Sequence, residues 1–310
     1  MKGVLSCLLV TFAATSGCVI LGFWKIVTRI SASKAEPLLL RKTDYTIIWW
    51  CLVNQKMIQW LGLSKITIDI DTNKPLDLQK WYLIFCNHQT WVDILILQTS
   101  LLQLIAPIKF FTKSQLKWVP FIGIAMYGLD FPYVKRATRE QIKANPTLAT
   151  LDRDNIFEAC ERFKNHPTCV LNFLEGTRFS PSKHQQQNSK YKHLLSPKIG
   201  GASYVLAAMR EHLDSILDIT IYYPEGVPTF WDFLSGKNKN VIMKIKDFPI
   251  PEQSGPSSSD HKREVQSLVE KIWEEKDLYL QDLTQESLVS CSTTRGCLFL
   301  LATRVFPLID

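Results

Sequence analysis

The chain lacks the sequence signals of several common classes of protein. Its 310 residues include eight cysteines, but no two form a Cys-x-x-Cys pair, which disfavours a metal site and is typical of structural thiols in a reducing compartment. No Gly-x-Ser-x-Gly segment is present, so the nucleophile elbow of a lipid hydrolase is missing. No nucleic-acid-binding signature accompanies the net charge of +7, so nucleic acid is not an expected partner. This charge instead suits an anionic membrane surface or an acidic substrate.

Charge is also absent from the stretch between Gly3 and Phe23. Such a length matches the apolar core of a bilayer, which needs about 20 helical residues. A cleaved signal peptide is disfavoured because the stretch is too long and the basic residues follow it. By the positive-inside rule the C-terminal side is cytoplasmic. Whether this helix spans the bilayer or only dips into it stays open.

A second N-terminal segment, residues 45–63, is amphipathic and rich in tryptophan. This composition indicates a helix at the membrane interface, and the alternative is a surface helix packed on the domain. We therefore predict that residues 1–63 form a helical membrane anchor, made of a hydrophobic helix over 3–23 and an amphipathic helix over 45–63.

The remaining chain predicts one α/β domain over residues 64–250 and a linker with a helical segment over 251–310. Alternating or continuous apolar runs predict strands at 65–70, 81–86, 107–113, 130–134, 168–173, 216–224 and 241–250. Helical spacing predicts helices at 94–105, 114–120, 152–165 (with an Asp cap), 200–209 and 260–283. The glutamine-rich cationic stretch 180–198 is expected to be a solvated loop, near enough to the site to offer lysines to phosphate groups.

His88 and Asp93 lie between the predicted strand 81–86 and the helix that follows it. On one helix, a separation of five residues would point the two side chains about 140° apart, so they meet only if His88 lies in the loop and Asp93 in the first helical turn. There the carboxylate would fix the tautomer of the imidazole and stabilise its charged form. No serine or cysteine nucleophile is adjacent, so a substrate hydroxyl is expected in that place. The alternative is a helix cap without a catalytic role.

A second motif, Asn-Phe-Leu-Glu-Gly-Thr-Arg, occupies residues 172–178, at the end of the predicted strand 168–173. Arg178 offers a planar fork that suits bidentate contact with phosphate. Gly176 leaves room for close approach of the backbone to a ligand. The alternative here is an ion-paired turn.

Together, the Asn-His-x4-Asp and Phe-x-Glu-Gly-Thr-Arg motifs resemble those of the glycerolipid acyltransferases, the family of 1-acylglycerol-3-phosphate (lysophosphatidate) acyltransferase. The resemblance runs from about Lys65 to Pro249. The sequence from Asn172 onward is similar to that of a branch with bacterial inner-membrane and lysocardiolipin-type enzymes. Leu174 departs from the proline usual in the family. The resemblance implies a single mixed-sheet α/β domain flanked by helices, preceded by a two-helix membrane anchor.

The resemblance also implies roles for particular residues. His88 and Asp93 would be catalytic, with His88 as the general base. Substrate would be bound by Glu175, Gly176, Thr177, Arg178, Arg136 and Lys135. Glu175 would orient Arg178 or hold the hydroxyl of the acceptor.

Gly128, Phe131 and Arg136 are counterparts of a second family motif that binds the acceptor phosphate; a solvated strand end is the alternative for Lys135 and Arg136. The strand that closes on Pro224 is similar to a fourth motif, which serves the acyl donor.

The implied activity is transfer of a fatty acyl group to the free hydroxyl of a lysophospholipid, first of all 1-acyl-glycerol-3-phosphate, to give phosphatidic acid. Lysophosphatidylglycerol and lysocardiolipin are alternative acceptors, and a non-catalytic membrane lipid-binding protein is a rival from another class. Acyl-CoA or acyl carrier protein would be the co-substrate, with no cofactor and no metal. The resemblance places the protein in a membrane, as a bacterial inner-membrane protein with a cytoplasmic catalytic domain. The number of subunits is not predicted.

Overall fold

The centre of the protein is a six-stranded mixed sheet with the strand order β1-β8-β7-β2-β6-β3. The computed structural model describes residues 1–30, 36–119, 122–129, 131–134, 143–145, 147–251 and 258–302. The strands of the sheet are β1 (Lys65–Asp71), β2 (Trp81–Cys86), β3 (Ile108–Phe110), β6 (Cys169–Phe173), β7 (Leu213–Tyr222) and β8 (Asn240–Phe248). Strands β4 (Thr112–Lys113) and β5 (Tyr133–Val134) form a separate pair.

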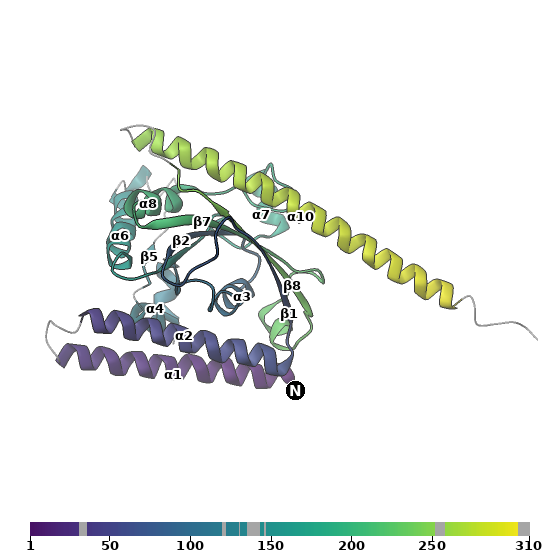
Figure 1. Cartoon of the computed structure of the whole chain (residues 1–310), viewed down its shortest axis with the longest axis horizontal. Helices are drawn as coiled ribbons and strands as arrows, with labels where there is room; N and C mark the ends of the chain where they lie inside the picture. Colours follow the sequence, from purple (N-terminus) through teal and green to yellow (C-terminus); the bar gives the residue numbers. More distant parts are fainter. Residues whose placement is uncertain are drawn as a thin grey trace, which may run out of the picture.

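Helices cover both faces of this sheet (Figure 1). Helices α6, α8 and α10 lie over one face, while α3 and the antiparallel hairpin of α1 and α2 lie on the other. The helices are α1 (Lys2–Ile30), α2 (Glu36–Leu61), α3 (Val92–Ser100), the 3₁₀ helix η1 (Ser114–Trp118), α4 (Ile122–Gly128), α6 (Thr147–Phe163), α7 (Pro181–Gln187), α8 (Gly200–Met209), α9 (Phe230–Leu234) and α10 (Ser258–Ala302). The predicted fold class, a mixed α/β sheet flanked by helices, is therefore confirmed.

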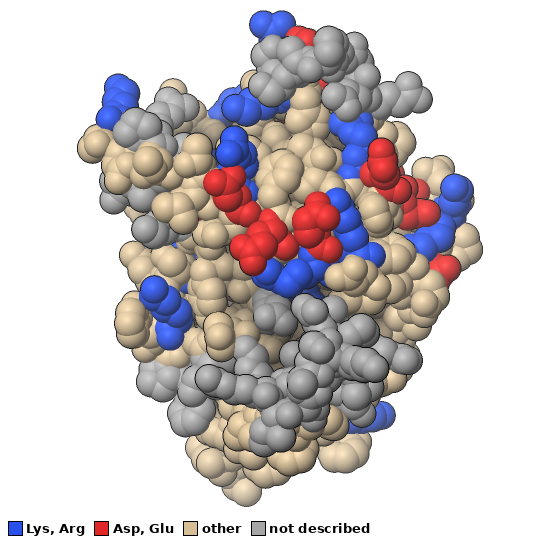
Figure 2. All heavy atoms as spheres, turned by 90° about the vertical axis from the view of Figure 1, so that its left-hand side faces the viewer, with Lys and Arg blue, Asp and Glu red and all other residues tan. Residues whose placement is uncertain are grey.

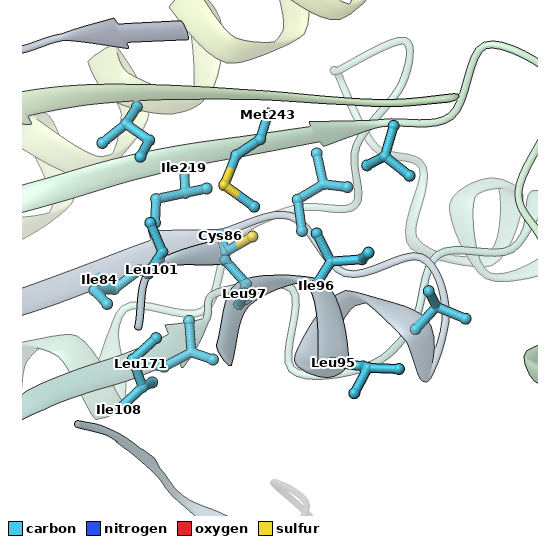
Figure 3. Close-up of a cluster of buried hydrophobic side chains, with 14 of the residues drawn as sticks. Ile84, Cys86, Leu95, Ile96, Leu97, Leu101, Ile108, Leu171, Ile219 and Met243 are labelled. Carbon is cyan, nitrogen blue, oxygen red and sulfur yellow. The ribbon is translucent and has the colours of Figure 1, made fainter. Parts of the chain in front are cut away.

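Strand β2 is buried on both faces because its sequence is apolar throughout. Ile84 and Cys86 face the core cluster that includes α3, and Leu83 and Phe85 face the second cluster, with α6, α8 and α10. Figure 3 shows the first cluster, in which Ile84 and Cys86 lie near side chains of α3 and Met243 of β8. A continuous apolar run is typical of a parallel strand covered on both sides, and the prediction of a buried strand over 81–86 is confirmed.

The pairing of β2 determines where the site forms. It runs parallel to both neighbours, with Cys86 opposite Phe173 of β6 and Ile219 of β7. The carboxyl ends of three strands therefore meet at one edge of the sheet, which is where open α/β sheets place their ligands. The antiparallel pair in the main sheet is β7 with β8.

Several predicted boundaries move in the structure. The helix predicted over 94–105 ends at Ser100, and the helix predicted from an Asp cap at residue 152 already begins at Thr147. The predicted helix over 45–63 belongs to the longer α2. The prediction of a solvated loop over 180–198 is wrong, because the segment contains α7 and buries Tyr191, Leu194 and Leu195.

The face formed by α6 carries charges of both signs side by side, in the middle of Figure 2. Pairs along this helix include Arg162 with Glu158, four residues apart and 2.8 Å between nitrogen and oxygen. Such exposed pairs each contribute less than about 1 kcal/mol to stability, so this face is a solvated surface.

Candidate active site

His88 and Asp93 are in direct contact at the carboxyl edge of the sheet. His88 lies in the loop after β2, and Asp93 lies in the first turn of α3. The imidazole Nδ1 is 2.9 Å from Asp93 Oδ2, and the two side chains are 13% and 1% exposed. This is the arrangement that the spacing predicts. Because a carboxylate only accepts hydrogen bonds, Nδ1 donates its proton to it, and in this tautomer Nε2 carries the lone pair that can accept a proton.

Asp93 is held by more than the histidine. Its Oδ2 also accepts the backbone N–H groups of Gln89 at 2.6 Å and Thr90 at 2.9 Å, and its Oδ1 accepts the hydroxyl of Tyr223 at 2.7 Å. These four donors compensate the carboxylate for its burial. Tyr223 belongs to neither sequence motif, and its place beside Asp93 follows from the pairing of β7 with β2, which the sequence does not reveal.

The imidazole of His88 is also oriented by its neighbours. Its ring stacks on Phe173, the last residue of β6, with centroids 4.0 Å apart and planes inclined by 16°. The backbone carbonyl of His88 accepts the N–H of Phe179 at 2.7 Å. Both contacts come from the Phe-x-Glu-Gly-Thr-Arg motif and its end, so the two motifs form one site.

Glu175 is hydrogen-bonded to the backbone of the His88 loop. It is fully buried; its Oε1 accepts the backbone N–H of His88 at 2.7 Å and its Oε2 that of Leu195 at 3.0 Å. Burial raises the pKa of Glu175 to about 7, against the two backbone hydrogen bonds that lower it. The expectation that this carboxylate orients Arg178 is wrong, because both oxygens are used inside the protein and Arg178 is exposed.

The turn at Gly176 presents cations to solvent. Gly176 has a φ of 68°, a left-handed conformation that favours glycine. A Cβ there would lie 3.4 Å from Lys198 Nζ. Lys183 Nζ donates to Thr177 Oγ1 at 2.8 Å. The guanidinium carbon of Arg178 lies 4.8 Å from the centre of the Trp91 ring, an exposed indole at the start of α3.

The remaining predicted site residues either lie elsewhere in the fold or fall outside the described residues. Lys135 and Arg136 lie outside the described residues. Phe131 is buried and packs edge-on against Phe110, and Gly128 ends α4. Within the described part of the chain, no group of three or more His, Cys, Asp or Glu side chains could hold a metal ion.

An α/β fold with a buried His–Asp pair at the carboxyl edge of its sheet defines the class, and comparison with known proteins defines the family. The family model described as Acyltransferase matches residues 65–227, just over half of the chain, and the chain belongs to this family. The matched region contains both motifs of the site.

The sequence identity between this chain and individual relatives is low. Lysocardiolipin acyltransferase 1 of Gallus gallus is 26% identical over 297 residues, which cover 86% of this chain and 74% of that protein. 1-Acyl-sn-glycerol-3-phosphate acyltransferase gamma of Homo sapiens is 24% identical over 255 residues, which cover 78% of this chain and 63% of that protein. The chain thus spans less than two thirds of the latter. The crystal structure of the 1-acyl-sn-glycerophosphate (LPA) acyltransferase PlsC from Thermotoga maritima matches with a TM-score of 0.44 and 18% identity, covering 89% of this chain and 97% of that chain.

Proposed function

We propose that this acyltransferase moves a fatty acyl group from a thioester to the free hydroxyl of a lysophospholipid, with His88 as the general base. The observation that carries the proposal is the hydrogen bond from His88 Nδ1 to Asp93, which leaves Nε2 able to accept a proton at a partly exposed edge of the sheet. Without a serine or cysteine nucleophile in either motif, the attacking oxygen is that of the acceptor.

The proposed reaction has two steps. His88 Nε2 takes the proton of the acceptor hydroxyl as its oxygen bonds to the thioester carbonyl carbon, and Asp93 stabilises the imidazolium that forms. The tetrahedral intermediate then collapses, the carbon–sulfur bond breaks, and the imidazolium returns its proton to the leaving thiolate. A positioned general base typically contributes about 10² to 10⁴ in rate, and binding both reactants together contributes further.

The acceptor phosphate is proposed to bind beside the Gly176 turn. Arg178 is exposed there on Trp91, and Lys198 and Lys183 flank the same turn. The N–H of Gly176 already donates to the carbonyl of Phe173 at 2.9 Å, so the cationic side chains rather than the backbone are the proposed ligands of the phosphate. Glu175 contributes by supporting the loop of His88 rather than by touching substrate. Binding of the phosphate by Lys135 and Arg136 stays a prediction.

The position of α1 favours a protein that lies on one side of a membrane. Among the described residues, α1 is the one helix long and apolar enough to span, over Lys2–Trp24. It is flanked by the α/β domain at both ends: a Cβ at Gly3 would lie 3.1 Å from the ring of Trp231 in α9, and one at Gly128 of α4 would lie 3.1 Å from Leu21.

A spanning α1 would draw that domain into the hydrocarbon, at a large cost for its polar groups. We therefore propose that α1 lies in the interfacial plane, with residues 1–63 as the anchor, 64–250 as the catalytic unit and 251–310 as a helical appendage.

The names of the relatives guide the choice of acceptor. Those with a similar sequence act by name on lysocardiolipin or on 1-acyl-sn-glycerol-3-phosphate, so we propose an anionic lysophospholipid, with 1-acyl-glycerol-3-phosphate first and lysocardiolipin second. The two relatives named above come from animals, which favours the lysocardiolipin-type enzymes over the bacterial ones within the predicted branch. A bacterial inner membrane with a cytoplasmic active site stays a prediction. Acyl-CoA is the proposed donor, with acyl carrier protein as the alternative.

A labelled acyl donor tests the proposal. Purified protein in vesicles is incubated with radiolabelled acyl-CoA or acyl carrier protein and, separately, with 1-acyl-glycerol-3-phosphate, lysophosphatidylglycerol or lysocardiolipin. Formation of labelled ester supports transfer and identifies the acceptor. Release of free fatty acid alone would make the protein a hydrolase, and retention of lipid without chemistry would make it a binding protein; either result contradicts the proposal.

A further inference from the structure

Tyr223 donates a hydrogen bond to Asp93, and it lies outside both sequence motifs. It follows directly after β7, which runs parallel to β2, so its side chain reaches the same edge of the sheet. Three of the four donors to Asp93, including His88 Nδ1, converge on Oδ2. Oδ1 accepts the hydroxyl of Tyr223 at 2.7 Å, and the tyrosine is 3% exposed.

The end of β7 is itself tied to the His88 loop. The side-chain amide of Asn87 makes two hydrogen bonds of 2.9 Å with the backbone of Ile221: Nδ2 donates to the carbonyl, and Oδ1 accepts the N–H. Thr90 Oγ1 donates to the carbonyl of Pro228 at 2.8 Å. The tyrosine therefore occupies a fixed position relative to the carboxylate. Burial, together with the nearby Asp93, raises the pKa of Tyr223 well above its usual value, so its hydroxyl stays a donor.

We propose that Tyr223 is a positioning residue that acts on His88 through Asp93; this inference rests on the proposed function. By holding Oδ1, the tyrosine prevents rotation of the carboxylate about its Cβ–Cγ bond and keeps Oδ2 aimed at Nδ1. Loss of the hydroxyl leaves Oδ1 buried without a donor, and the carboxylate then turns away from the best geometry for the imidazole. Tyr223 does not touch the reacting atoms.

The variant Tyr223→Phe removes the hydroxyl and keeps the ring. A hydrogen bond to a charged group is worth a factor of about 10 to 100, so kcat should fall roughly 10- to 100-fold while KM for both substrates changes less than about threefold. Tyr222→Phe is the matched control. It removes the neighbouring hydroxyl, which lies 2.9 Å from Ser287 Oγ of α10, and should leave kcat within about twofold.

A double-mutant cycle with Asp93→Ala separates positioning from general structural support. If Tyr223 acts through Asp93, adding Tyr223→Phe to Asp93→Ala changes kcat by less than about twofold. The inference is overturned if Tyr223→Phe keeps the same kcat as Tyr222→Phe, or if the double variant loses kcat by the product of the two single losses. It is also overturned if Tyr223→Phe does not fold. Full activity in His88→Ala would instead overturn the proposed function, so the two failures are distinguishable.

Discussion

At the scale of single residues, two buried carboxylates from different elements hold one short loop. Asp93 of α3 binds the imidazole of His88 and two backbone N–H groups of the loop. Glu175, after β6, binds the backbone N–H of His88 itself. The first carboxylate sets the tautomer and the second sets the position of the backbone, so the histidine is fixed through both its ring and its main chain.

Glu175 should make stability depend on pH in a definite direction. Its pKa is about 7 in the folded protein against an ordinary 4.5. Between these values the unfolded chain releases a proton that the folded protein keeps, so the free energy of unfolding falls as pH rises, by about 3 kcal/mol in total. Below pH 4.5 and above pH 7 this contribution is constant.

Replacing Glu175 with glutamine removes that titration. We expect the difference in free energy of unfolding between wild type and Glu175→Gln, measured by thermal unfolding in detergent micelles, to shrink from pH 4.5 to pH 7. A difference independent of pH would contradict the burial argument. Glu158→Gln is a matched control, because Glu158 is an exposed carboxylate on α6.

The sequence was sufficient to predict the His88–Asp93 pair but not its support. The pair depends on a five-residue spacing at a strand–helix junction, which is local information. The contact of Glu175 with the backbone of His88 joins residues 87 positions apart, and the contact of Tyr223 with Asp93 joins residues 130 apart. Such partners follow from the strand order, which periodicity does not reveal.

At the scale of elements, hydrogen bonds link α10 to the segment that supports the site. Its apolar residues pack against the sheet: Val265, Val269, Ile272 and Trp273 are fully buried, and Leu268 is partly buried. Trp273 Nε1 donates to the carbonyl of Leu195 at 3.0 Å, and Asp277 accepts the backbone N–H groups of Lys192 and His193. Because Leu195 N–H binds Glu175, α10 is linked through this segment to the His88 loop.

These same contacts explain why the solvated-loop prediction for residues 180–198 is wrong. The composition is polar and cationic, which alone favours a solvated segment. Carboxylate and indole groups of α10, about eighty residues later, fix the backbone and let Tyr191, Leu194 and Leu195 enter the core. Tertiary contacts therefore override the local preference.

A buried ion pair between α10 and the sheet gives a second prediction. Lys276 Nζ lies 2.8 Å from Asp218 Oδ1 and donates to the carbonyl of Ile219 at 2.6 Å, with both side chains almost fully buried. Burial raises the pKa of Asp218, and Lys276 opposes this effect. Lys276→Met leaves an uncompensated buried carboxylate and should lower the free energy of unfolding by about 3–5 kcal/mol.

Two further variants test the cause of that loss. Lys271→Met, an exposed lysine on the same helix, should change stability by less than about 0.5 kcal/mol. Adding Asp218→Leu to Lys276→Met removes the unpaired charge and should recover most of the stability in thermal unfolding. No recovery would mean that packing of the lysine stem, rather than charge, explains the loss.

At the scale of the whole molecule, the domain and its order of strands and helices could largely be predicted, while its assembly could not. The apolar runs 65–70 and 81–86 predict strands that the structure confirms to within a residue. The neighbours of β2 in the sheet, which come from far along the chain, carry no local signal. The same holds for the packing of α1 along the domain, and hence for its orientation to a membrane.

Thiol labelling tests that orientation. With α1 in the interfacial plane, both ends of the helix lie on the side of the catalytic domain. A Lys2→Cys variant in sealed vesicles should therefore react with a membrane-impermeant maleimide to the same extent as Lys271→Cys on α10, above the background of the native cysteines. Labelling of one of these two sites with protection of the other would show that α1 spans the bilayer.

If the imidazole of His88 removes the proton from the acceptor hydroxyl, the rate of ester formation in vesicles must depend on it, and His88→Ala measures this dependence. His88→Ala should lose about 10² to 10⁴ in kcat, with thermal unfolding and vesicle binding unchanged. His212→Ala, which truncates an exposed histidine just before β7, should keep full activity. Near-normal transfer by folded, membrane-bound His88→Ala would show that His88 is not the general base.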